Sequence, residues 1–216
     1  MLPVGDDNRG RRGVPVVTYA LIALNIIVFL LELSFGDAFI ERWAFVPARF
    51  LANPLADFPT IFTSMFMHAG LFHLGSNLLY LWIFGDNVED RFGPLRFIIF
   101  YLLCGVAAVF AQMAINPGSN LPNVGASGAI SGVLGAYIIM FPQGRVNVLM
   151  GRGVVAMPAL VVIGLWIVLQ FFSGIGSIAD TAQTGGVAYW AHIGGFVAGL
   201  LLTYLLQGGR MRLSRG

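Results

Sequence analysis

Three short stretches of this chain place polar side chains where apolar segments begin. HAGLFHLGSN contains His68, His73 and Asn77, GASG contains Ser127, and AHIGG contains His192. Polar and ionisable side chains inside apolar segments are costly and often mark functional sites. A serine hydroxyl becomes an effective nucleophile when a histidine removes its proton, so these residue types suit acyl transfer.

His73 and Asn77 could supply the hydrogen-bond donors that acyl transfer also requires at the developing oxyanion. They are four residues apart and therefore share one face of a helix. The backbone N–H groups of Ala126 and Ser127 lie at a predicted helix start, where amides are unpaired and point outward. Since the apolar segments carry no Asp or Glu near these residues, a pair of Ser127 and His192 is favoured over a triad.

Glycines recur on the segments that carry the serine and the last histidine. They are Gly125, Gly128, Gly132 and Gly135 in one segment and Gly195 and Gly199 in the other. Small residues let helices approach closely in lipid, so contact between these faces would bring Ser127 near His192. Close packing alone, without chemistry, is the alternative interpretation of the GASG stretch.

Metal binding is the alternative interpretation of the histidines. His68, His73 and His192 could act together as ligands. Their spacing lacks the i, i+4 histidine pair and neighbouring carboxylate of common zinc motifs. The single cysteine, Cys104, cannot form an internal disulfide and gives no information on the redox compartment.

The composition is that of a membrane protein. Of the 216 residues, 57% are hydrophobic and 10% are charged, whereas about 25% of a soluble domain is charged. The net charge of +2 and the lack of a basic patch interleaved with aromatic residues argue against a nucleic-acid partner.

Six apolar segments approach the length of about 20 residues that a membrane-spanning helix needs. They cover residues 16–33, 71–87, 95–115, 126–141, 154–172 and 188–206. The sequence therefore predicts an all-α membrane protein, with a six-helix core over residues 16–207 between tails at 1–15 and 208–216. The connection over residues 34–70 is rich in aromatic residues and is expected to lie in the membrane interface.

The arginines predict the orientation of these segments. With six spans, only Arg42 and Arg49 of the twelve basic residues fall on the side opposite the termini. Basic residues collect on the cytoplasmic side, so both termini are expected to be cytoplasmic. His73, Ser127 and His192 then all lie near the outer face at similar depth.

These motifs resemble those of the rhomboid family of intramembrane serine proteases, over about residues 16–206. GASG is similar to the family's GxSG nucleophile motif, and HAGLFHLGSN to its HxxxxHxxxN on the second helix. AHIGGFVAG is similar to HxxGxxxG on the sixth helix, and EDRFG at 89–93 to the ExRxG after the second. Four patterns in the family's order, each on the expected segment, are highly specific.

The resemblance implies a rhomboid-like six-helix bundle that works as an intramembrane serine endopeptidase, without a metal or cofactor. Ser127 would be the nucleophile and His192 the general base and then acid. His73, Asn77 and the backbone N–H of the serine would form the oxyanion site, and His68 would support the structure or retain water. The substrates would be single-span membrane proteins, cleaved near the outer face. The short tails and the absence of extra domains, rather than the resemblance, favour a bacterial cytoplasmic membrane.

Two places depart from the family pattern. Pro59 and Thr60 stand where some members carry Trp-Arg in the first loop. Ser131 stands where some members have an aromatic side chain that packs against the catalytic histidine, so Trp190 or Phe196 is expected to hold that ring instead.

Two other functions compete with the protease. A catalytically silent rhomboid-like protein that binds membrane clients would normally lack either Ser127 or His192, and this chain has both. A transporter or channel would carry ionisable residues at mid-membrane depth and often an internal repeat. The sequence leaves the natural substrate and the oligomeric state open.

Overall fold

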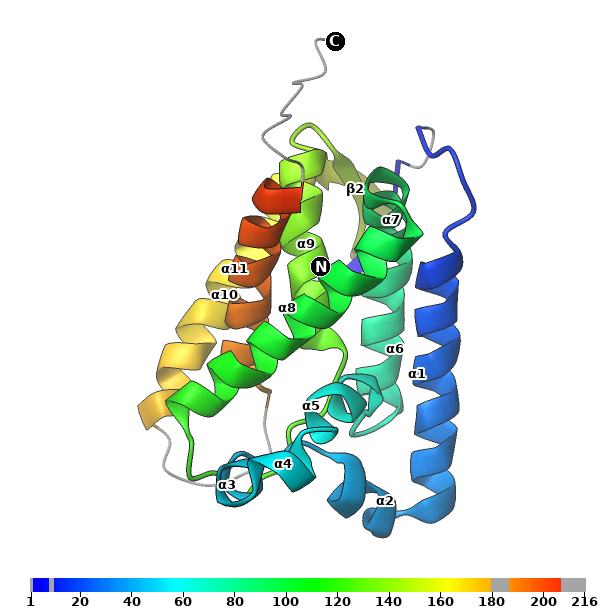
Figure 1. The fold of residues 1–216 in the computed structure, drawn as a ribbon. Helices are drawn as coiled ribbons and strands as arrows, with labels where there is room; N and C mark the ends of the chain where they lie inside the picture. Colours follow the sequence, from blue (N-terminus) through cyan, green and yellow to red (C-terminus); the bar gives the residue numbers. More distant parts are fainter. Residues whose placement is uncertain (1, 8–9, 180–186, 207–216) are drawn as a thin grey trace.

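The computed structural model describes residues 2–7, 10–179 and 187–206, so the predicted tail at 208–216 lies outside the described residues. The chain is mostly helical, with a small sheet (Figure 1). The helices are α1 (Val16–Phe35), α2 (Asp37–Trp43), α3 (Pro47–Ala52), α4 (Pro54–Asp57), α5 (Thr60–Thr63), η1 (Ser64–Phe66), α6 (Leu71–Tyr80), η2 (Leu81–Gly85), α7 (Asp86–Phe92), α8 (Pro94–Ile115), α9 (Ser127–Met140), α10 (Ala159–Ala179) and α11 (Tyr189–Leu206). The strands are β1 (Leu2–Asp6), β2 (Arg145–Met150) and β3 (Gly153–Pro158).

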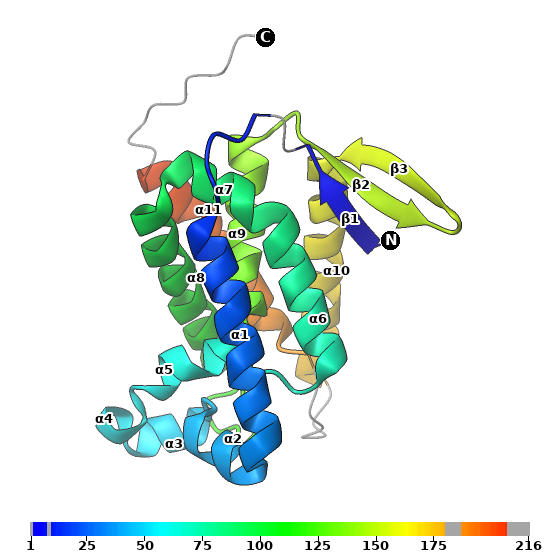
Figure 2. The ribbon, with the colours of Figure 1, turned by 90° about the vertical axis from the view of Figure 1, so that its right-hand side faces the viewer.

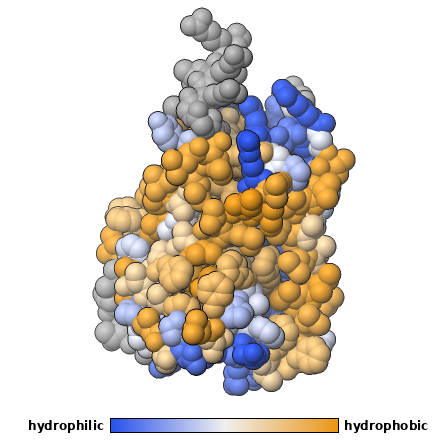
Figure 3. Space-filling view, viewed as in Figure 1, coloured by the Kyte–Doolittle hydropathy of each residue, from blue (hydrophilic) through white to orange (hydrophobic). Residues whose placement is uncertain are grey.

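Helices occupy each of the six predicted apolar segments. Among the described residues, α1, α8, α10 and α11 are long and apolar enough to cross a membrane, and α9 is shorter. The second segment is a continuous run of α6, η2 and α7, in which η2 is a π-helical turn. A broad hydrophobic belt covers the face of the bundle shown in Figure 3, with polar groups gathered near its two ends.

The fifth predicted span is wrong at its start, because residues 153–158 form a strand and helix α10 begins only at Ala159. The sheet is antiparallel in the order β1–β2–β3 and projects beside α10 (Figure 2). Valine-rich strands and a two-residue turn at Gly151, where φ is +61°, favour this hairpin over a helix. The all-α expectation therefore holds for the bundle and misses the sheet.

Helix α9 lies inside the bundle, between α11 and α6 in Figure 1. Every residue from Gly128 to Tyr137 is buried. A Cβ atom at Gly195 would collide with the carbonyl oxygen of Gly128, and one at Gly199 with that of Gly132. The two helices therefore pack backbone against backbone, as glycine-rich faces allow.

The buried carboxylate of Glu89 caps the start of α1. It accepts hydrogen bonds from the backbone N–H groups of Val17 at 2.9 Å and Thr18 at 2.7 Å, and from the Thr18 hydroxyl at 2.8 Å. Helix α1 has no side-chain cap of its own, so this contact satisfies amides that its first turn leaves unpaired. Arg91, two residues along, lies over the Phe141 ring at 5.0 Å.

Strand β1 is tied to the bundle through Asp6. One carboxylate oxygen accepts hydrogen bonds from the Asn87 amide at 2.6 Å and the Tyr137 hydroxyl at 2.8 Å. A few residues on, Arg11 forms an ion pair with the buried Asp86 at 2.6 Å. The first strand thereby links α7 and α9 to the hairpin that leads into α10.

We expect the attachment of β1 to be pH-dependent. Burial, with the nearby charges of Asp86 and Asp7, raises the pKa of Asp6 to about 6, against the opposing effect of hydrogen bonds from Tyr137 and Asn87. Because the pKa of Asp6 is higher in the folded than in the unfolded protein, protonated Asp6 stabilises the fold. This stabilisation is present in full below pH ~4 and is lost as the pH rises through about 6. Asp6→Asn should therefore raise the unfolding temperature at pH 7.5 but not at pH 4.

Thermal unfolding of the detergent-solubilised protein at the two pH values measures this difference. Glu41→Gln, which removes a charge from an exposed side chain, is the control. An Asp6→Asn variant that is no more stable than the wild type at pH 7.5 would contradict the assignment.

Candidate active site

Ser127 and His192 lie in contact at the ends of two packed helices. Ser127 is the first residue of α9, and His192 lies in the first turn of α11. The Nε2 atom of the imidazole is 2.8 Å from the serine Oγ. Since the glycine contacts set the two backbones at close range, the two side chains meet without bridging water.

The other side of the His192 ring is held by α10. The Nδ1 atom of His192 lies 2.7 Å from Oε1 of Gln170, which is on α10. The Trp166 ring packs against the imidazole with centroids 5.6 Å apart and planes inclined by 34°. These two residues are four apart and so share one face of α10.

The prediction that Trp190 or Phe196 holds this ring is therefore wrong. The indole N–H of Trp190 donates to the Gly174 carbonyl at 3.2 Å, and Phe196 belongs to the hydrophobic core. Sequence reasoning missed Trp166 and Gln170, although an amide side chain inside an apolar helix was a signal. The Ser131 hydroxyl donates to the Ser127 carbonyl at 2.6 Å.

The structure also brings His73 to the serine. A Cβ atom at Gly125 would meet Cε1 and Nε2 of His73 at 2.9 Å and the Ser127 Oγ at 3.5 Å. Only glycine suits this position, because its φ is +136° and the imidazole fills the space. The His73 Nδ1 atom accepts from the Ala69 N–H at 3.3 Å, which leaves the hydrogen of a neutral ring on Nε2, on the Gly125 side.

Asn77 lies one turn from His73 on α6. Its side-chain amide donates one hydrogen to the His73 carbonyl at 3.1 Å and retains a second hydrogen. Helix α9 begins with Ala126 as its N-cap residue and no side-chain cap bond, so the first amides of this helix lack intrahelical partners. The His73 ring thus lies beside the residues that lead into α9, whereas the Asn77 amide bonds back to its own helix.

His68 is a buried neighbour of this group. Its ring lies edge-on to His73 with centroids 5.1 Å apart, and its two ring nitrogens have no hydrogen-bond partner among the described residues. The backbone N–H of His68 donates to both carboxylate oxygens of Glu32, at 3.1 Å each. Glu32 lies on α1, within the predicted segment 16–33, so the expectation that no Asp or Glu of the apolar segments lies near the candidate residues is wrong for His68.

The histidines do not form a metal site with other ligands. Within residues 2–7, 10–179 and 187–206, no group of three His, Cys, Asp or Glu side chains is arranged to hold a metal ion. Two of the imidazoles already have partners on Ser127 and Ala69.

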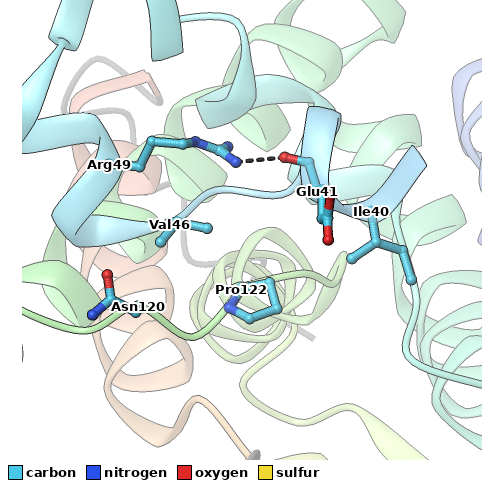
Figure 4. Close-up of a pocket in the computed structure, with 6 residues that line it drawn as sticks. All are labelled: Ile40, Glu41, Val46, Arg49, Asn120 and Pro122. Carbon is cyan, nitrogen blue, oxygen red and sulfur yellow. Dashed lines mark hydrogen bonds between the residues drawn. The ribbon is translucent and has the colours of Figure 1, made fainter. Parts of the chain in front are cut away.

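Arg49 holds the connection that precedes α6. Its guanidinium forms an ion pair with Asp57 at 2.7 Å and donates to the carbonyls of Glu41 and Ala44. Figure 4 shows it in a pocket lined by Ile40, Glu41, Val46, Arg49, Asn120 and Pro122, which includes none of the predicted site residues. Thr60, at the position that departs from the family pattern, donates instead to the Asp57 carbonyl at 2.6 Å.

Comparison with known proteins adds to this geometry. Residues 56–208 match the Rhomboid domain family. Rhomboid protease GluP of Bacillus subtilis is 32% identical over 196 residues, which cover 89% of this chain and 36% of that protein. Rhomboid protein 1, mitochondrial, of Saccharomyces cerevisiae is 27% identical over 196 residues, which cover 88% of this chain and 53% of that protein. The human presenilin-associated rhomboid-like protein, mitochondrial, is 32% identical over 134 residues, which cover 60% of this chain and 34% of that protein.

The chain spans between about a third and a half of the length of these relatives. The domain match covers more than half of the chain and includes the segments that carry the GASG stretch and both histidine motifs. Together with its long apolar helices, these findings show that the chain is an integral membrane protein and belongs to the rhomboid family.

Proposed function

We propose that this protein is an intramembrane serine endopeptidase that hydrolyses peptide bonds in or near transmembrane segments of other membrane proteins. The 2.8 Å contact between Ser127 Oγ and His192 Nε2 carries this proposal. A nucleophile and a base within hydrogen-bond reach, with the base held by a third group, is the arrangement of covalent hydrolases. The similarity to GluP, which is named as a rhomboid protease, supports the same reaction class.

The reaction proceeds in two halves. His192 Nε2 takes the proton of Ser127 as Oγ attacks the scissile carbonyl carbon, and the resulting oxyanion is stabilised by the start of α9, His73 and Asn77. The protonated His192 then gives its proton to the departing amine, which leaves an acyl-serine. In the second half His192 removes a proton from water, the hydroxide attacks the ester, and the proton returns to Ser127 Oγ.

The depth of the site follows from the length of α9. Fourteen residues at 1.5 Å each span about 21 Å, which is shorter than the hydrocarbon core of about 30 Å. Ser127, at the first residue, therefore lies below the membrane surface. Water must reach it through a cavity with polar walls, which His68, His73 and Asn77 supply.

The orientation places the serine end toward the outer face of the membrane. The core over residues 16–207 crosses the membrane six times, and both tails and the sheet lie on the cytoplasmic side. The arginine distribution supports this arrangement. Substrates are single-span proteins cleaved near the outer face of a bacterial cytoplasmic membrane. Both bacterial and mitochondrial rhomboids are among the relatives that match this chain.

Labelling with a serine-directed fluorophosphonate tests the proposal, in parallel with cleavage of a model single-span substrate that carries small residues near its outer end. We expect a stoichiometric label on Ser127 and a discrete cleavage product. A folded protein that neither reacts with the reagent nor cleaves any of several such substrates would favour a client-binding role instead.

A further inference from the structure

We propose that Gln170 is a positioning residue that fixes the tautomer of His192, so that Nε2 is free to accept the proton of Ser127. This inference rests on the proposed function for its catalytic meaning. Gln170 lies on α10, which carries neither Ser127 nor His192. It therefore adds α10 to the helices α6, α9 and α11 that carry the other candidate site residues.

The hydrogen-bond chemistry decides which ring nitrogen carries the hydrogen. The atom of Gln170 that lies 2.7 Å from Nδ1 is the carbonyl oxygen Oε1, which can only accept. Nδ1 must then carry the single hydrogen of the neutral ring, and Nε2 faces the Ser127 hydroxyl at 2.8 Å as an acceptor. The reversed amide would put the hydrogen on Nε2 and leave the serine without a base.

Trp166 is the second α10 residue that holds the His192 ring in place. Its indole packs on the imidazole at 5.6 Å, one helical turn from Gln170 on the same face of α10. The hydrogen bond fixes the edge of the ring, and the indole fixes its plane. Both contacts act where some family members use an aromatic residue at the position of Ser131.

A neutral amide suits this environment better than a carboxylate. In soluble serine proteases a buried aspartate orients the histidine and stabilises its charged form. Removing a carboxylate from water is strongly unfavourable unless strong partners compensate for the loss. Gln170 provides the orienting acceptor without a charge, so it preserves the tautomer and gives less stabilisation to the imidazolium.

Three variants separate positioning from packing. Gln170→Met has similar length and removes the acceptor, whereas Gln170→Glu keeps an oxygen at the same place. Gln112→Met is the matched control, because Gln112 contacts the same part of α11 but accepts from the Ala191 backbone N–H at 3.2 Å. Gln170 is only partly buried, so its substitution leaves the core intact.

The first readout is the ¹⁵N NMR spectrum of protein labelled at histidine, which is tractable because the chain has three histidines. His192→Asn identifies the resonances of the catalytic ring. We expect His192 to show a protonated Nδ1 and an unprotonated Nε2 at neutral pH in the wild type and in Gln112→Met. Gln170→Met should show a mixture of tautomers, and Gln170→Glu should restore the wild-type pattern.

The second readout is the cleavage rate. We expect Gln170→Met to lower kcat by roughly 10- to 100-fold, a fraction of the whole contribution of general base catalysis, with KM within about twofold. Gln170→Glu should recover most of that loss.

A dominant Nε2–H tautomer in the wild type, or an unchanged tautomer in Gln170→Met, would overturn the inference. If the tautomer responds to Gln170 but no variant cleaves substrate or reacts with a fluorophosphonate, the positioning role stands and the protease function fails.

Discussion

Ser127→Ala is expected to lower the rate of substrate cleavage by about 10⁴-fold or more, because it removes the only atom that forms the acyl intermediate. His192→Ala should cause a loss of similar size, since an unactivated hydroxyl is a poor nucleophile. The double variant should be no less active than either single variant, because the two side chains act as one unit. Initial cleavage rates of purified variants in liposomes measure all three.

The unfolding temperature shows whether a variant loses cleavage activity because a catalytic group is missing or because the protein has unfolded. Ser127→Ala removes one hydrogen bond, worth about 1 kcal/mol, and should leave the unfolding temperature almost unchanged. Ser131→Ala is the matched control, since it removes a hydroxyl one turn along the same helix, which donates to the Ser127 carbonyl. It should cleave substrate within a few-fold of the wild-type rate. Full activity of Ser127→Ala would show that another residue is the nucleophile.

The contact between Ser127 and His192 could be anticipated because it rests on local patterns. Each motif marks its own segment, and the glycines of α9 and α11 indicate which two faces meet. Gly195 and Gly199 lie against Gly128 and Gly132, as the spacing suggested. Small-residue faces are specific in this way, since few other surfaces let two backbones touch.

Other parts of the site could not be read from the sequence. Trp166 and Gln170 stand in an apolar helix whose rotation relative to α11 is set by packing, and no local pattern encodes that rotation. The partner of Glu32 is a backbone amide 36 residues away. Strand β1 pairs with β2 across about 140 residues. No local pattern signals this pairing, and residues 154–158 of the hairpin were therefore predicted as the start of a helix. Contacts of this kind depend on tertiary structure and override local propensity.

The glycine contact between α9 and α11 leads to the second large effect, which is on folding. Gly195→Ala should destabilise the protein by about 3 kcal/mol or more, because its Cβ would overlap the Gly128 carbonyl oxygen. Both colliding groups belong to helical backbone, so neither can rotate away. The helices must separate, which also breaks the contact between Ser127 and His192. We expect a large fall in unfolding temperature in detergent and a parallel loss of fluorophosphonate labelling.

Gly164→Ala provides the comparison that isolates this contact. Gly164 also lies inside a membrane helix, but a Cβ atom there would meet nothing within 4 Å. Alanine favours a helix over glycine by about 1 kcal/mol, so this variant should be as stable as the wild type or more so. Helix propensity alone would raise the unfolding temperature of both variants, whereas the backbone contact lowers that of Gly195→Ala only. Equal unfolding temperatures for Gly195→Ala and Gly164→Ala would mean that α9 and α11 do not pack through their glycines, and the placement of Ser127 against His192 would lose its physical basis.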